Sequence, residues 1–156
     1  MKLKLAYILA GLLLAAGPAM AVAPDPFVGT WVFNAAKSKY LGAPMPKSNT
    51  AVYAAVGSGL HVTANGTNAQ GQPTHTEYTA NFDGKDYPVD GNADYDMVSL
   101  KRLSSHKLTF IRKKAGVKVQ WGTMTVSTDG KTRTIVTDGM GPAKTKMHTV
   151  AVYEKK

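Results

Sequence analysis

Histidines and carboxylates are the side chains in this sequence that could bind a metal ion or transfer protons near neutral pH. The chain has no cysteine, so thiolate ligands and disulfides are excluded. Its four histidines lie too far apart to form a metal-ligand motif: His61, His75, His106 and His148. We therefore predict no metal site and no bound cofactor. His148 shares its strand parity with Val150 and Val152, so it could face an interior and is kept as a candidate ligand-binding residue.

A loop rich in carboxylates could bind a hard cation. Oxygen-bearing side chains alternate along it: Asp90, Asn92, Asp94 and Asp96. Calcium prefers ligands of this kind, but a calcium loop also requires glycine at its sixth position and a bidentate glutamate at its twelfth. This chain has Tyr95 and Lys101 at those positions, so we predict an ordinary polar loop.

A third group of residues could bind an amphipathic organic molecule. Aromatic side chains and one arginine recur at strand positions that could share one interior: Tyr78, Phe82, Tyr87, Phe110, Arg112 and Trp121. If these faces all point inward, they form an apolar lumen ringed by hydroxyl groups, in which Arg112 could meet an acidic group. Alternatively, the side chains fill the interior completely and the protein acts through its surface.

No sequence motif for catalysis is present. The chain lacks a nucleophile elbow, an HExxH motif, a phosphate-binding loop and a carboxylate pair brought together by spacing. We therefore predict no catalytic residue.

Short β-strands must position these side chains, because apolar residues alternate and no long helical pattern occurs. Segments that we expect to be strands are 26–34, 50–56, 60–65, 97–103, 107–113, 117–127, 132–138 and 146–154. Together with the segments around Tyr78 and Tyr87 they make about ten strands, joined by turns rich in Gly, Asp and Asn. An antiparallel sheet of this length usually closes on itself, so we predict an all-β, single up-and-down barrel of about 8–10 strands. An open sandwich is the alternative.

Pairing of neighbouring strands can be predicted from the apolar positions. A three-residue loop at 69–71 places Val62 opposite Tyr78 and requires a left-handed backbone at Gly71. His61 and His75 then face outward. We also expect the segment with Tyr87 and Val89 to pair with the segment of Tyr78, through the turn 83–86.

Two further segments carry predictions. Prolines in 34–49 exclude a helix longer than one turn, so we expect a short helical turn at 35–39 and then an extended arm across an open end of the barrel. Gly122 interrupts the alternation of its strand, which suits a bulge or a sharp bend.

The segment Phe27-Val28-Gly29-Thr30-Trp31 resembles the opening strand of the calycins, the superfamily of lipocalins and fatty-acid-binding proteins, in which Gly-x-Trp begins an up-and-down barrel. The resemblance implies structural roles for Gly29 and Trp31. Trp31 would close one end of the barrel and leave the other open.

The resemblance does not extend to ligand-binding residues. Fatty-acid-binding proteins have a helix pair where this chain has the short arm 34–49, and an Arg-x-Tyr near the C-terminus that is absent here. Lipocalins often have a late arginine packed on the first-strand tryptophan, and Arg133 is the residue that this chain offers. The combination of Trp31, Asn34 and the proline-rich arm also resembles small exported bacterial lipocalin-like proteins.

The N-terminus resembles a secretory signal peptide. Lys2 and Lys4 precede an apolar run that ends before Gly17, and small residues lead to a cleavage site after Ala21. We expect residues 1–21 to be removed and residues 22–156 to form one barrel domain, periplasmic or secreted.

The sequence is basic, with a formal net charge of +9. We predict a monomeric, exported, lipocalin-like protein that binds a small apolar or amphipathic molecule in the barrel lumen. The alternative is an envelope protein whose basic outer surface meets an anionic lipid, a polysaccharide or a protein. A third alternative is a lumenal acid–base enzyme. Export argues against nucleic acid as a partner.

Overall fold

The computed structural model describes residues 24–141 and 144–156, and the predicted signal peptide lies outside them. The regular secondary structure of the described chain consists of β-strands and one 3₁₀ turn, η1 (Ala35–Lys37). The strands are β1 (Gly29–Phe33), β2 (Lys39–Leu41), β3 (Ser48–Val56), β4 (Gly59–Thr67), β5 (Pro73–Asn81), β6 (Tyr87–Pro88), β7 (Met97–Ser104), β8 (Lys107–Lys114), β9 (Val117–Val126), β10 (Thr132–Met140) and β11 (Lys146–Lys155). No helix in these residues is long and apolar enough to cross a membrane.

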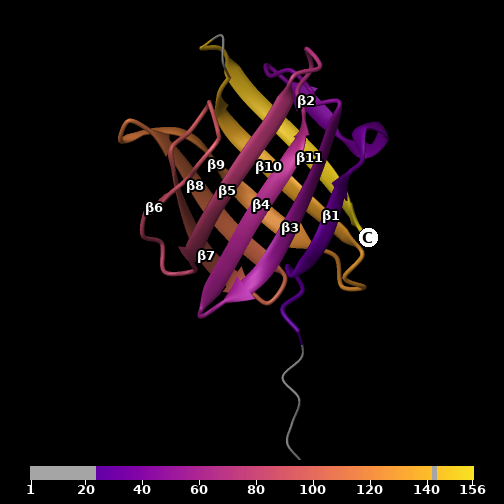
Figure 1. Ribbon diagram of the computed structural model, residues 1–156, viewed down its shortest axis with the longest axis vertical. Helices are drawn as coiled ribbons and strands as arrows, with labels where there is room; N and C mark the ends of the chain where they lie inside the picture. The colour runs from indigo at the N-terminus through magenta and orange to yellow at the C-terminus, as the bar shows by residue number, and fades with distance from the viewer. Residues whose placement is uncertain (1–23, 142–143) are drawn as a thin grey trace, which may run out of the picture.

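The strands form one antiparallel sheet that curls into a nearly closed up-and-down barrel (Figure 1). Its order is β5-β4-β3-β1-β11-β10-β9-β8-β7-β6, and β2 adds to β11 outside this path. Most neighbours are also consecutive in sequence, while β1 pairs with β3 on one side and with the last strand, β11, on the other. The predicted barrel is therefore confirmed.

The barrel is incompletely closed between β5 and β7, and here the predicted pairing of the segment with Tyr87 and Val89 onto β5 forms only in part. Tyr87 lies in β6, which pairs with β7 and not with β5. The backbone N–H groups of Glu77 and Asp90 each donate to the other residue's carbonyl, at 3.0 and 2.9 Å. This pair is an isolated β-bridge, and a second isolated bridge in the described chain joins Asp83 and Lys101. The turn 83–86 therefore leads the chain across the gap and onto β7.

The register of the other hairpins follows the apolar pattern. Val62 lies opposite Tyr78, and Gly71 has a φ of 90°, as predicted. On the outer face His61 lies beside Thr79 and His75 beside Asn65.

The arm after β1 crosses the upper end of the barrel in Figure 1, also as predicted. Asn34 caps η1 by accepting a hydrogen bond from the Lys37 N–H at 3.1 Å. The Ser38 hydroxyl accepts a hydrogen bond from the Val152 N–H at 2.9 Å, which ties the arm to β11. β2 then pairs with β11, and the following prolines run over the interior.

Gly122 permits a close approach of backbones and does not form a bulge, which was one of the two features expected at this position. A Cβ atom here would lie 1.8 Å from the Val136 carbonyl oxygen and 3.0 Å from the Phe110 ring. The register shift between β8 and β9 occurs instead at Arg112 and Lys113. The absence of a side chain at Gly122 thus makes room for Phe110 inside the barrel.

Trp31 is fully buried at the end of the barrel opposite the arm, as its structural role requires. Its Nε1 donates to the Phe27 carbonyl at 2.8 Å. The guanidinium carbon of Arg133 lies 5.0 Å from the Trp31 ring, 4.2 Å from Tyr53 and 4.5 Å from Tyr153. Arg133 is also fully buried, so the charge is stabilised by three aromatic faces in place of water.

Replacing Trp31 by alanine should lower the free energy of unfolding by about 3–5 kcal/mol, because it opens a cavity and removes a ring from Arg133. A thermal melt should show a fall in Tm of at least about 10 °C. Trp121→Ala is the matched control, since Trp121 is 41% exposed and exposed substitutions usually cost about 0.5 kcal/mol or less. Equal falls in Tm for the two variants would contradict the structural role of Trp31.

Candidate functional site

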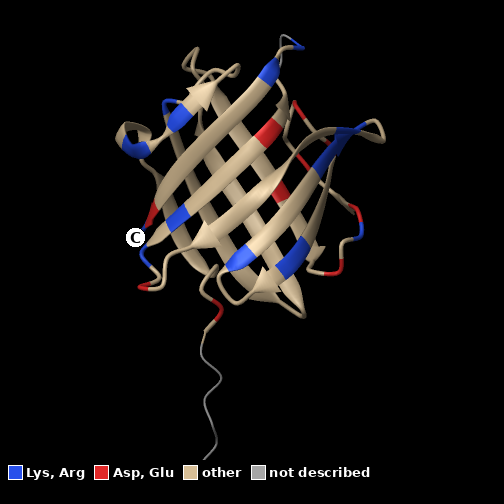
Figure 2. Cartoon of the chain, turned by 180° about the vertical axis from the view of Figure 1, so that it is seen from behind, with Lys and Arg blue, Asp and Glu red and all other residues tan. Residues whose placement is uncertain are grey.

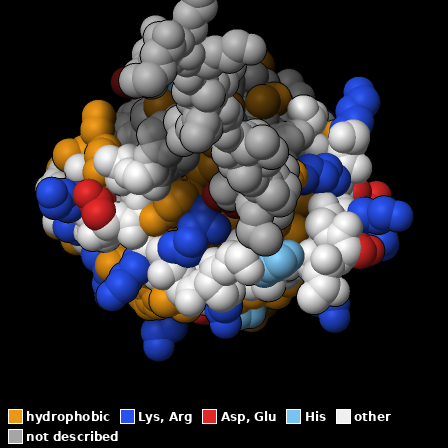
Figure 3. Space-filling view, turned by 90° about the horizontal axis from the view of Figure 1, so that it is seen from below, with side chains coloured by type: hydrophobic (Ala, Val, Ile, Leu, Met, Phe, Trp, Pro, Cys, Tyr) orange, Lys and Arg blue, Asp and Glu red, His pale blue; other side chains and the backbone are white. Residues whose placement is uncertain are grey.

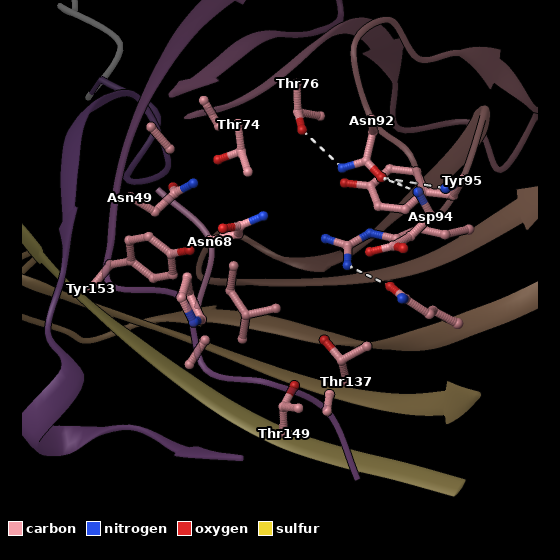
Figure 4. A pocket seen from close by; sticks show the side chains of 18 of the residues that line it. Asn49, Asn68, Thr74, Thr76, Asn92, Asp94, Tyr95, Thr137, Thr149 and Tyr153 are labelled. Carbon is pink, nitrogen blue, oxygen red and sulfur yellow. Dashed lines mark hydrogen bonds between the residues drawn. The ribbon is translucent and has the colours of Figure 1, made fainter. Parts of the chain in front are cut away.

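The barrel encloses a cavity of about 320 Å³ beneath the arm (Figure 4). Inward side chains of β3, β4, β5, β8, β9, β10 and β11 form its wall. Ala43, Pro44 and Pro46 of the arm border its mouth, together with the loop after β4 and the loop before β7. The cavity is therefore a pocket that opens at one end of the barrel and is closed at the other by Trp31 and its neighbours.

Arg112 supplies a positive charge to the cavity wall. Its guanidinium carbon lies 4.6 Å from the centres of both the Tyr95 and the Phe110 rings, and its Nη1 donates to Gln120 Oε1 at 3.0 Å. Within the described residues, no carboxylate lies close enough to Arg112 to form an ion pair. The guanidinium is thus held in place by neutral groups and keeps donors for another partner.

Burial would by itself lower the pKa of Arg112, but the oxygens of the surrounding tyrosines offset this effect, and its pKa lies above the ordinary value. Burial raises the pKa of the Tyr78, Tyr95 and Tyr153 hydroxyls. At neutral pH the interior therefore contains a charged guanidinium and protonated phenols. Both are hydrogen-bond donors, an arrangement that suits an anion.

The region near the mouth is lined by amide and hydroxyl side chains. Figure 4 shows Asn49, Asn68 and Thr74 on one side of the space and Thr137 and Thr149 on the other. The cavity is therefore more polar than the apolar lumen that we expected.

Two of the predicted ligand-binding residues line this cavity: Tyr78 and Arg112. Phe110 is buried against the Arg112 guanidinium but does not line the cavity itself. Phe82 packs under Arg102, with 4.0 Å between the guanidinium carbon and the ring centre. Tyr87 lies at the gap in the barrel, where its hydroxyl donates to Asp83 at 2.9 Å. The structure thus does not bring these five candidates together in one cavity.

The expectation that Trp121 and His148 face the lumen is wrong. Trp121 pairs with Ile111 and is 41% exposed, with the Lys118 ammonium 4.4 Å from its ring. His148 is exposed, and its Nδ1 lies 2.7 Å from an Asp138 carboxylate oxygen. Arg112 pairs with Gln120 but Lys113 pairs with Lys118, so Val119 is the extra residue of a bulge in β9. The side-chain alternation that runs through Trp121 therefore does not continue regularly past Val119.

Side chains of the carboxylate loop accept hydrogen bonds from the backbone of the loop itself and from the β8–β9 turn. The Asn92 side-chain oxygen accepts from the Asp94 N–H at 2.9 Å and from the Tyr95 N–H at 3.3 Å. Asp96 accepts from the Ala115 N–H at 3.0 Å. In the part of the chain that the structure describes, no group of three His, Asp or Glu side chains could hold a metal ion.

Several lining residues were missed by sequence reasoning. Tyr53 and Tyr95 lie beside Arg112, and Thr137 and Thr149 are paired across β10 and β11. Their positions in the strands could have identified both threonines, since Thr137 is two residues from the buried Ile135 and Thr149 two residues from the buried Ala151, and residues two apart share a face.

The fold and its internal cavity define a small, nearly closed up-and-down β-barrel of calycin-like architecture. No protein-family model matches the chain. No curated protein sequence matches it with significance. Among solved structures, it is similar to zebrafish ileal bile acid-binding protein in complex with cholic acid, with 13% identity and a TM-score of 0.49. That alignment covers 84% of this chain and 98% of the zebrafish protein.

Alkaline titration should reveal the buried phenols. Their folded-state pKa values are raised, so their contribution to stability is complete below the ordinary tyrosine pKa of about 10 and is lost as pH rises above it. Absorbance at 295 nm should therefore show some tyrosines ionising only with cooperative unfolding, followed in parallel by circular dichroism. Tyr78→Phe should make this alkaline loss of stability smaller. Ionisation of all tyrosines near pH 10 in a folded protein would contradict their burial.

Proposed function

We propose that this protein is an exported binding protein that holds a small amphipathic acid in its barrel cavity. The observation that carries the proposal is Arg112, a charged group inside an open cavity, with no carboxylate partner in the described chain. The polar head of the ligand pairs with Arg112, and its body lies against the tyrosine rings.

The energetics of burial support this role for Arg112. Arg112 is half-buried, so its charge loses part of its hydration without gaining an opposite charge, and stacking on Tyr95 and Phe110 offsets only part of that cost. An anionic ligand lowers it further by forming charge-assisted hydrogen bonds with the guanidinium. Ligand binding is thereby coupled to the stability of the barrel.

Action through the basic outer surface has less support. Lys and Arg positions are distributed along the wall and at both ends of the barrel (Figure 2). Seen from the end opposite the mouth, basic side chains occur around much of the visible circumference (Figure 3). They therefore do not define one face for an envelope partner. The described cavity lining contains no histidine, so acid–base chemistry there would depend on Asp94 or on tyrosines whose pKa values are raised.

Arg112→Gln should weaken the binding of the anionic fluorophore 1-anilinonaphthalene-8-sulfonate by about tenfold or more. A hydrogen bond to a charged group contributes about 1.5–3 kcal/mol, and 1.4 kcal/mol corresponds to tenfold in affinity. The measurement is a fluorescence titration of folded protein, accompanied by native mass spectrometry for co-purified acids.

Arg102→Gln is the matched control, because Arg102 stacks on Phe82 and pairs with Asp25 away from the cavity. Its affinity for the fluorophore should equal that of the unmodified protein. Equal weakening by both substitutions, or the absence of saturable binding, would contradict the proposal.

Export is supported by the leader pattern at residues 1–21. The mature protein should begin at Val22, which N-terminal sequencing of secreted or periplasmic material would show. Intact Met1 on protein from the cytoplasmic fraction would refute export without affecting the ligand proposal.

A further inference from the structure

The cavity is small for a protein that binds organic ligands. Its volume of about 320 Å³ lies at the lower end of the range of about 300–1,000 Å³ for such sites. A ligand that is enclosed here must be compact. A long acyl chain would have to leave the cavity through its polar mouth.

The described wall offers few large aliphatic side chains to such a chain. Most of its aliphatic residues are alanine or proline, and the larger ones are Val62, Ile135 and Met147. A buried methylene group contributes about 0.8 kcal/mol only where its surroundings are apolar. Against amide and hydroxyl groups this gain is reduced, because those groups lose hydrogen bonds to water and receive none in return.

Two threonine side chains, each with a hydroxyl group, lie side by side in the cavity wall. Thr137 of β10 is directly opposite Thr149 of β11, and both are 4% exposed while lining the cavity. Side chains opposite each other in an antiparallel pair have Cβ atoms about 4.5–5.5 Å apart, so both can bond to one small molecule. A hydroxyl donates and accepts, and it therefore suits a ligand hydroxyl or carbonyl group.

Polar groups also face this pair across the cavity. Asn49 comes from β3 and Asn68 from the loop after β4, and Figure 4 shows both on the opposite side of the space from Thr137 and Thr149. Asp94 lies at the exposed rim, where its carboxylate can accept hydrogen bonds. A ligand could thus place its carboxylate at Arg112 and its other oxygen atoms near the mouth, where each would have a hydrogen-bond partner.

We infer that the ligand is a compact acid carrying several hydroxyl or carbonyl groups, and not a long-chain fatty acid. This inference rests on the proposed function of the same cavity. It assigns Arg112 to the carboxylate, and Thr137 and Thr149 to the hydroxyl groups. The tyrosine rings provide flat surfaces against which a ring or a short carbon skeleton packs.

The test uses acids that differ in their hydroxyl groups and share the carboxylate. Isothermal titration calorimetry of the mature protein compares 3,4-dihydroxycinnamate with cinnamate, gluconate with hexanoate, and all four with dodecanoate. In at least one pair the hydroxylated acid should bind about tenfold more tightly than its parent, as expected for hydrogen bonds to groups otherwise left unpaired. It should also bind more tightly than dodecanoate.

Two variants separate the roles within the site. The double substitution Thr137→Val and Thr149→Val keeps the side-chain shape and should reduce the preference for the hydroxylated acid to threefold or less. Arg112→Gln should weaken both members of the pair by similar factors. Circular dichroism establishes that each variant is folded, and Arg102→Gln again serves as the control outside the cavity.

The outcomes distinguish this inference from the proposed function. The ligand class would be wrong if dodecanoate bound most tightly and lost affinity in Arg112→Gln, or if neither hydroxylated acid bound more tightly than its parent acid. In either case the proposal that the cavity binds an acid would remain. An unchanged preference in the double valine variant would overturn the roles of Thr137 and Thr149. No binding of any acid, and none of the fluorophore, would overturn both.

Discussion

The pairing of β1 with both β3 and β11 is the constraint on which the rest of the barrel depends. It joins the first strand of the meander to the last, so that strands far apart in sequence share one interior. The same pairing brings Trp31 and Tyr153 of β11 against the guanidinium of Arg133 in β10. One end is filled by this stack, and the space that remains lies at the other end. The position of the cavity is thus a consequence of how the sheet closes.

Polar groups inside the barrel are arranged by the twofold alternation of side chains along each strand. Arg133 and Arg112 both enter the interior, but their surroundings differ. Arg133 is fully buried against three aromatic rings at the inner part of the cavity, whereas Arg112 is half-buried and lies on two rings in the cavity wall. The Arg133 guanidinium therefore packs into the core where it borders the cavity, and two of its nitrogens, Nε and Nη1, have no hydrogen-bond partner within the described residues.

Local alternation and turn chemistry were sufficient to predict most of the strands and the Val62–Tyr78 register, and the resemblance of the first strand to the calycins predicted the structural role of Trp31. They failed where the structure departs from regular pairing. The bulge at Val119 interrupts the alternation within β9, and Trp121 was expected inside although it lies outside. The segment with Tyr87 joins β7 because the chain crosses a gap, which no local pattern records. Arg112 could be placed in the site, but Thr137 and Thr149 were not distinguished from ordinary strand threonines.

The incomplete joint between β5 and β7 has a mechanical consequence. Elsewhere the wall is a continuous ladder, so widening it would require many hydrogen bonds to break together. At this joint the described chain is held by two isolated bridges. Fluctuations of the wall should concentrate there, because local opening follows the smallest number of bonds to be broken. The barrel is therefore stiff around most of its circumference and compliant along one line, which runs beside the loop that borders the mouth.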